Sequence, residues 1–126
     1  MIYYDGCVKK MDQELRKAEL FKIVEKYFRQ KNNIDFQKDV ELKGSTKKWK
    51  LDLVVQTEDG AKFGVVVKDW ARTLGVNQVR QLQKACYDIP LDGGILVSNA
   101  FSPSALSFGE RYGISCFSRY EILSKI

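Results

Sequence analysis

The chain has 126 residues, of which 44% are hydrophobic and 29% are charged, proportions of an ordinary globular protein rather than a disordered one. The length suits one domain over residues 1–126. No apolar run approaches the ~18 residues that cross a bilayer, and the N-terminus lacks a signal-peptide pattern, so a cytoplasmic protein is expected. The net charge of +5 favours a polyanionic partner such as nucleic acid.

The number and spacing of the cysteines and the histidine content limit which catalytic and metal-binding groups the chain can supply. The three cysteines are widely spaced, no CxxC pair occurs, and the sequence contains no histidine. This pattern argues against a zinc site and excludes catalysis by an imidazole. Catalysis by this chain would therefore use carboxylates, lysine and a hard metal ion such as Mg²⁺.

The first half of the chain predicts one helix and three strands. Helical spacing of apolar residues predicts a helix over residues 12–31. Alternating apolar and polar residues predict strands, with a basic turn over residues 43–48 after the first strand and a hairpin turn over residues 57–60 after the second. The three predicted strands cover residues 35–42, 49–56 and 61–68.

The second half alternates helices with strands. Helices are predicted over residues 77–87 and 102–111, the second beginning at the Ser-Pro pair 102–103. Short strands over residues 95–97 and 114–117 follow them, and a last helical turn covers residues 119–124. The resulting order, αβββαβαβ with a final short helix, predicts an α/β fold with a mixed sheet flanked by helices.

An acid and a lysine lie on two of the predicted strands. Strict alternation puts Asp52 on one face of the second strand and Lys68 on one face of the third, so the two side chains are expected to lie close together. Alternation groups Lys50, Asp52 and Val54 on one strand, and Gly64, Val66 and Lys68 on the other. An acid and a lysine placed like Asp52 and Lys68 can bind Mg²⁺ and polarise a scissile phosphate, or they can form a partly buried salt bridge.

The order and spacing of these motifs resemble a known family. The chain has VVVKDW at the end of its third predicted strand, LGVNQVRQL leading into the next helix and GGILVSNAFSPSALSFGERYGISCFSRYEIL near its end. Over residues 51–123 it resembles the Mrr-like branch of the PD-(D/E)xK nuclease superfamily, to which archaeal Holliday junction resolvases are related. The resemblance implies a restriction-endonuclease-like fold and Mg²⁺-dependent cleavage of DNA.

The resemblance carries over to particular residues. It implies that Asp52 is the strand acid that binds metal, that Lys68 is the catalytic lysine and that Gln78 faces the site. The acid or glutamine that the family has two residues before the lysine is Val66 here. The family often adds a glutamate from the first helix, for which Glu19 or Glu25 would serve. Because valine cannot bind a hard cation, Mg²⁺ is expected to be weakly held or absent.

Basic residues near aromatic ones predict contacts with nucleic acid independently of catalysis. Such residues suit phosphate contacts and stacking, although a solvated lysine-rich turn would look the same. The predicted nucleic-acid-binding residues are Lys43, Lys47, Lys48 and Lys50 around Trp49, together with Arg72 beside Trp70, and Arg80.

Three functions are compatible with the sequence. The first is a DNA-binding protein of nuclease fold with weakened or lost cleavage. The second is an active Mg²⁺-dependent endonuclease that recruits Glu19, Glu25 or a neighbouring subunit in place of the missing ligand. The third is a pseudo-nuclease that binds other proteins. A two-fold homodimer would suit a duplex substrate.

Overall fold

The computed structural model describes residues 19–31 and 33–126. Its elements follow one another in the predicted order, so the predicted mixed α/β fold is confirmed. Residues 12–18 of the predicted first helix lie outside the described residues. The elements are α2 (Leu20–Arg29), β1 (Ile34–Lys43), β2 (Lys48–Thr57), β3 (Lys62–Lys68), α3 (Val76–Asp88), β4 (Gly93–Ser98), α4 (Pro103–Tyr112), β5 (Ile114–Ser118) and α5 (Arg119–Ser124).

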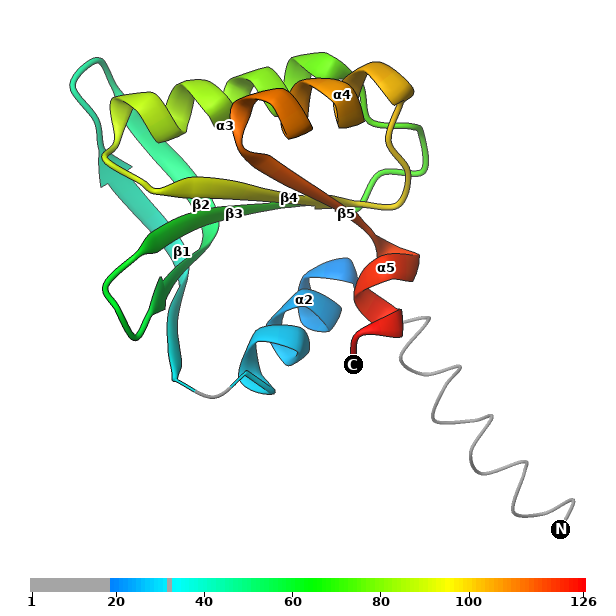
Figure 1. Ribbon diagram of the computed structural model, residues 1–126, viewed down its shortest axis with the longest axis horizontal. Helices are drawn as coiled ribbons and strands as arrows, with labels where there is room; N and C mark the ends of the chain where they lie inside the picture. The colour runs from blue at the N-terminus through cyan, green and yellow to red at the C-terminus, as the bar shows by residue number, and fades with distance from the viewer. Residues whose placement is uncertain (1–18, 32) are drawn as a thin grey trace, which may run out of the picture.

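The strands form one mixed sheet in the order β1-β2-β3-β4-β5. β1, β2 and β3 are antiparallel neighbours, whereas β3, β4 and β5 run parallel and are connected through helices. α3 and α4 cover one face of the sheet, and α2 and α5 cover the other (Figure 1). β3 is therefore the central strand, with the Asp52 strand on one side and β4 on the other.

Local sequence signals fix the helix ends that were predicted. The Ser102 hydroxyl accepts the Ala105 amide at 3.1 Å, and Pro103 begins α4. The same helix ends at Gly113, whose φ of 77° lies in the left-handed region that glycine adopts without strain. α2 has a buried stripe at helical spacing, which packs against the sheet: Leu20, Ile23, Val24 and Phe28.

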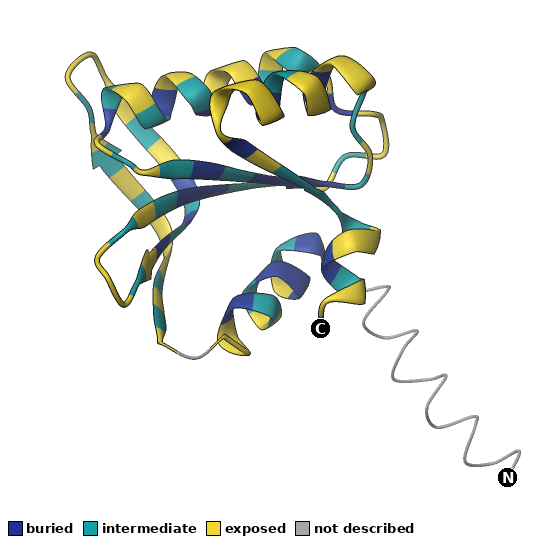
Figure 2. Cartoon of the chain, viewed as in Figure 1, coloured by how far each residue is buried: buried dark blue, intermediate teal, exposed yellow. Residues whose placement is uncertain are grey.

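Two apolar clusters lie on opposite faces of the sheet, where Figure 2 shows the buried residues of the strands and of the inward helix faces. On the α2 side, Leu53 and Val65 are fully buried. On the α3 side, Leu51, Leu82 and Leu96 form the corresponding cluster. None of the helices in the described part of the chain is long and apolar enough to cross a membrane.

Candidate functional site

The β1–β2 ladder is interrupted beside Asp52. Pairing is regular on both sides, from Lys38–Leu53 to Val40–Leu51, but no pair is recorded between Asp39 and Asp52. Asp39 has a φ of 50°, in the left-handed region that non-glycine residues rarely adopt. At the interruption β2 changes the face that it presents, since Leu51 packs in the α3-side cluster and Leu53, two residues later, packs in the α2-side cluster.

The interruption leaves Asp52 between the strands. The described β2–β3 pairing ends at Leu53–Val65, and beyond it the Asp52 carboxylate accepts the backbone amide of Val67 at 2.7 Å. A carboxylate that bonds a neighbouring strand's backbone lies near the plane of the sheet. Strict alternation, which put Lys50, Asp52 and Val54 on one face, is therefore wrong at Asp52. The prediction that Asp52 and Lys68 lie on adjacent antiparallel strands is confirmed.

Lys68 ends β3 on the α3 side of the sheet. Its carbonyl accepts the hydroxyl of Ser98 at 2.8 Å, and that serine is fully buried. Its ammonium lies 5.6 Å from the centroid of the Trp70 ring, and the Arg72 guanidinium lies 4.5 Å from the same ring. The buried Ser98 hydroxyl thus fixes the backbone of Lys68. The Trp70 ring attracts both the Lys68 ammonium and the Arg72 guanidinium.

Asp52 and Lys68 line two neighbouring pockets. Lys68 and Gln78, two of the predicted catalytic residues, line a pocket of about 110 Å³ together with Val66, Gln81 and Lys50. Asp52 lines a pocket of about 400 Å³ together with Asp39, Glu41 and Lys50. Lys50 and Leu51 line both pockets, so these two residues stand between the acid and the lysine.

The residues around Lys68 do not fit a magnesium centre. The described residues that line its pocket include no carboxylate, and Val66 occupies the position from which an acid would face Lys68. One Asp52 carboxylate oxygen already accepts a backbone amide. Within residues 19–31 and 33–126, no group of three acidic, cysteine or histidine side chains is placed to hold a metal ion. Mg²⁺ prefers several oxygen ligands in octahedral geometry, which this donor set does not supply.

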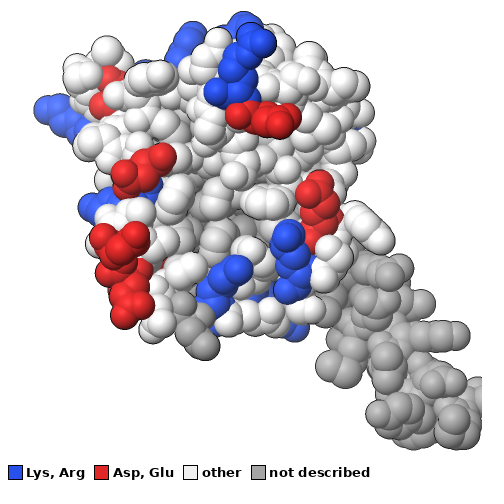
Figure 3. Space-filling view, viewed as in Figure 1, with Lys and Arg blue, Asp and Glu red and all other residues white. Residues whose placement is uncertain are grey.

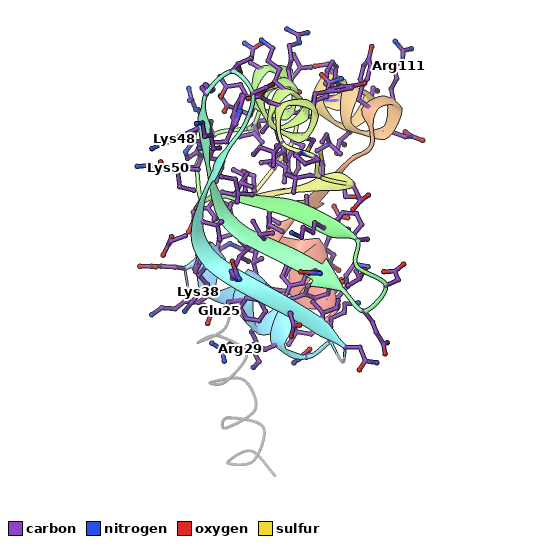
Figure 4. The ribbon with its side chains drawn as sticks, turned by 90° about the vertical axis from the view of Figure 1, so that its left-hand side faces the viewer. Glu25, Arg29, Lys38, Lys48, Lys50 and Arg111 are labelled. Atoms are coloured by element: carbon purple, nitrogen blue, oxygen red, sulfur yellow. The ribbon has the colours of Figure 1, made fainter. Side chains whose placement is uncertain are left out.

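The two first-helix glutamates lie on the α2 side of the sheet. Glu19 directly precedes α2, whose first amide, from Leu20, donates to Asp69 at 3.2 Å. The Glu25 carboxylate binds Arg29 at 2.5 Å and Lys38 at 3.4 Å, and Figure 4 shows these three side chains together. The hydrogen bond from Arg29 lowers the pKa of Glu25. Lys68 faces α3, on the opposite side of the sheet from Glu19. The role of Glu19 as a metal ligand therefore stays a prediction, and the fold does not support it.

A polar network that the sequence reasoning missed follows Lys68 on the other face. The Asn99 amide donates to the Asp69 carboxylate at 2.9 Å and to the Trp70 carbonyl at 2.7 Å. The Arg119 guanidinium donates to Asn99 at 2.8 Å and to Asp69 at 3.1 Å. The hydrogen bond from Asn99 is the main reason why the pKa of Asp69 is lowered. This network ties the segment after β3 to α2 and α5, so the Asp69 side chain points away from the face of Lys68.

The hairpin between β1 and β2 carries four of the predicted nucleic-acid-binding residues. Lys43 pairs with Lys48 in the ladder, Lys48 lies 3.8 Å from Glu41, and Lys47 lies 4.0 Å above the Trp49 ring. Figure 4 shows Lys48 and Lys50 near one another on this hairpin. The hairpin therefore brings these cations together at one edge of the sheet.

The other basic residues are spread out. Arg80 lies 5.4 Å from the Phe108 ring of α4, and Arg72 lies against Trp70. On the face drawn in Figure 3, cations alternate with acids and form no continuous basic surface. The six predicted nucleic-acid-binding residues come from three parts of the fold: the β1–β2 hairpin, the segment after β3, and α3.

Asp88 at the end of α3 anchors the hairpin, and no short motif revealed this role. Its carboxylate accepts the Ser45 hydroxyl at 2.5 Å, the Thr46 amide at 3.0 Å and the Trp49 indole at 2.6 Å. These hydrogen bonds, with that from Ser45 the largest, lower the pKa of Asp88. A Cβ on Gly44 would lie 2.1 Å from the same carboxylate, so a side chain at this position would push the Asp88 carboxylate away from its hydrogen-bond donors.

The two described cysteines do not supply a nucleophile. Cys86 and Cys116 are free thiols that pack against the α3-side cluster. Burial raises the pKa of each to about 11, so each thiol is protonated at neutral pH.

A mixed sheet with helices on both faces, and an acid and a lysine on adjacent strands, places the protein among the restriction-endonuclease-like proteins. The family model described as restriction endonuclease, Mrr_cat, matches residues 13–126, and the chain belongs to this family. This confirms the resemblance to the PD-(D/E)xK superfamily that the motifs predict. No curated protein matches the sequence significantly.

Solved structures with low sequence identity share the fold. A crystal structure of a protein of unknown function, AF1548, superposes with a TM-score of 0.68 at 15% identity, over 77% of this chain and 56% of that chain. EndoMS in its apo form superposes with a TM-score of 0.52 at 19% identity, over 81% of this chain and 46% of that chain. EndoMS in a complex with dsDNA superposes with a TM-score of 0.51 at 16% identity, over 75% of this chain and 41% of that chain. The chain spans about half the length of these proteins.

Proposed function

We propose that this member of the restriction endonuclease family binds DNA through the β1–β2 hairpin and cleaves it weakly or not at all. The observation that carries the proposal is Val66. It lies on the same face of β3 as Lys68, in the position of a metal-binding acid, and lines a pocket without a described carboxylate. Family membership supports DNA as the partner.

The proposed binding surface rests on the cations of the hairpin. Lys47 and Lys50 are exposed, and neither forms an ion pair with any described residue. Asp88 holds the hairpin tip in place, so these ammonium groups are presented by an ordered loop. EndoMS, which shares the fold, has been captured with dsDNA, and that supports a duplex as the first substrate to test.

The binding proposal predicts sequence-independent affinity for duplex DNA that falls steeply with salt. Each phosphate contact contributes about −0.9 to the slope of log affinity against log salt concentration. Changing Lys47, Lys48 and Lys50 together to glutamine should weaken binding and flatten the slope by about 1 for each lost phosphate contact. Fluorescence anisotropy of a labelled duplex over a salt series measures both quantities.

The matched control changes three exposed lysines on the α2 and α5 side, Lys22, Lys26 and Lys125, to glutamine. It removes the same net charge from the opposite side of the sheet. We expect its affinity and its salt slope to stay close to those of the wild type. An equal loss in both triple variants would show that net charge and not the hairpin is responsible, and a wild type that binds no duplex at low salt would disprove the proposal.

The second candidate is an active Mg²⁺-dependent endonuclease. One observation favours it: Asp39 stands opposite Asp52 and lines the same pocket, which brings a second carboxylate near the strand acid. A two-fold homodimer stays a prediction under either function. Cleavage assays, described in the Discussion, distinguish the two candidates.

A further inference from the structure

Tyr87 is an aromatic residue that the Asp52–Lys68 site does not use. It lies in the last turn of α3, and its relative exposure of 82% is the highest among the large hydrophobic residues that the structure describes. Full exposure of a large ring contributes nothing to the core. The ring is therefore free to offer a flat face to a ligand.

Tyr87 forms one wall of a groove between the end of α3 and the β1–β2 hairpin. The groove has a volume of about 480 Å³ and is lined by Thr46, Lys47, Trp49, Lys84, Tyr87 and Asp88. The Asp88 carboxylate bridges its two sides through the hydrogen bonds to the hairpin. The groove is thus held in shape before any ligand binds.

The charges of the groove suit an anionic ligand. Lys84 is exposed and precedes Tyr87 by three residues, so the two side chains lie on one face of α3. Lys47 enters from the hairpin, and neither lysine forms an ion pair with a described residue. The one acid in the lining, Asp88, is saturated by donors from the hairpin, which stabilise its charge within the protein.

We infer that this groove binds an unpaired nucleotide, whose base stacks on Tyr87 and whose flanking phosphates contact Lys84 and Lys47. The inference rests on the proposed function, because it names which form of DNA the protein prefers. A base inside a duplex offers no free face, whereas a single-stranded or extrahelical base does. Trp49 is not the stacking surface, because Lys47 covers its ring and its indole nitrogen donates to Asp88.

The test compares three variants on two DNAs. Tyr87→Ala should lower the affinity for a labelled oligothymidine about tenfold, because stacking contributes on the order of 1–3 kcal/mol per base. Tyr87→Phe keeps the ring and should restore binding. The matched control is Tyr120→Ala, which removes an equally exposed tyrosine, 80% accessible, from α5 on the other side of the sheet. Affinity for a blunt duplex should be unchanged in all three.

The outcomes separate this inference from the function on which it rests. Duplex binding with oligothymidine affinity that does not depend on Tyr87 overturns the inference and leaves DNA binding intact. An equal loss in Tyr120→Ala also overturns it, because the groove would then not be the site. Absence of binding to either DNA in the wild type overturns the inference and the proposed function together.

Discussion

Replacing Val66 with glutamate is expected to lower the free energy of unfolding by about 2 kcal/mol in the absence of metal. Val66 packs against the α3-side cluster, so the new carboxylate would lose water and apolar contacts. Lys68, two residues along the same face of β3, would offset part of this cost. Chemical denaturation of both proteins in a chelator measures the difference.

Magnesium should recover part of the stability that Val66→Glu loses. The variant adds a carboxylate to the Lys68 pocket, whose described lining has none, and an ion that binds only the folded state stabilises that state. We expect the melting temperature of Val66→Glu to rise with Mg²⁺ while that of the wild type does not. Val66→Met, which has a side chain of similar length without a carboxylate or an amide oxygen, is the matched control. A rise of equal size in all three proteins would show that the position has no special relation to metal.

Truncating Leu53 to alanine is expected to cost about 2–5 kcal/mol of stability, the range for a buried leucine whose cavity does not collapse. Leu53 is fully buried between β2 and α2, and it directly follows Asp52 in the strand. Removing the Leu53 side chain removes the apolar contacts that hold β2 against α2 just after the interruption. Thermal and denaturant unfolding measure the effect.

Leu106→Ala on α4 is the control for the core truncation. Leu106 is 45% exposed, so the same chemical change should cost less than about 1 kcal/mol. Similar losses in the two variants would contradict the placement of Leu53 in the core.

The sequence predicted the fold well because each of its signals is local. Alternation, the hairpin turn before β3 and the cap at Ser102 depend on residues only a few positions apart, and all three are present in the structure. The consecutive valines of β3 pack into the apolar clusters on both faces of the sheet. The adjacency of Asp52 and Lys68 follows from the β2–β3 hairpin and was therefore predictable.

The orientation of Asp52 was not predictable. Alternation assumes an unbroken ladder, but the ladder is interrupted at Asp39 and Asp52, a long-range event with no marker in the sequence. The roles of Asp88 and Asp69 depend on partners about 40 and 50 residues away along the chain, so spacing gave no signal for either.

The Lys68 pocket is not expected to support efficient phosphodiester cleavage. The most direct test of this expectation is the cleavage of duplex, single-stranded and four-way-junction DNA by protein in excess, in Mg²⁺ and in Mn²⁺, with Lys68→Ala in parallel. We expect negligible cleavage in Mg²⁺, at most slow cleavage in Mn²⁺, and no difference between the wild type and Lys68→Ala in Mg²⁺. Robust cleavage by the wild type in Mg²⁺ that Lys68→Ala abolishes would contradict it and establish an active endonuclease.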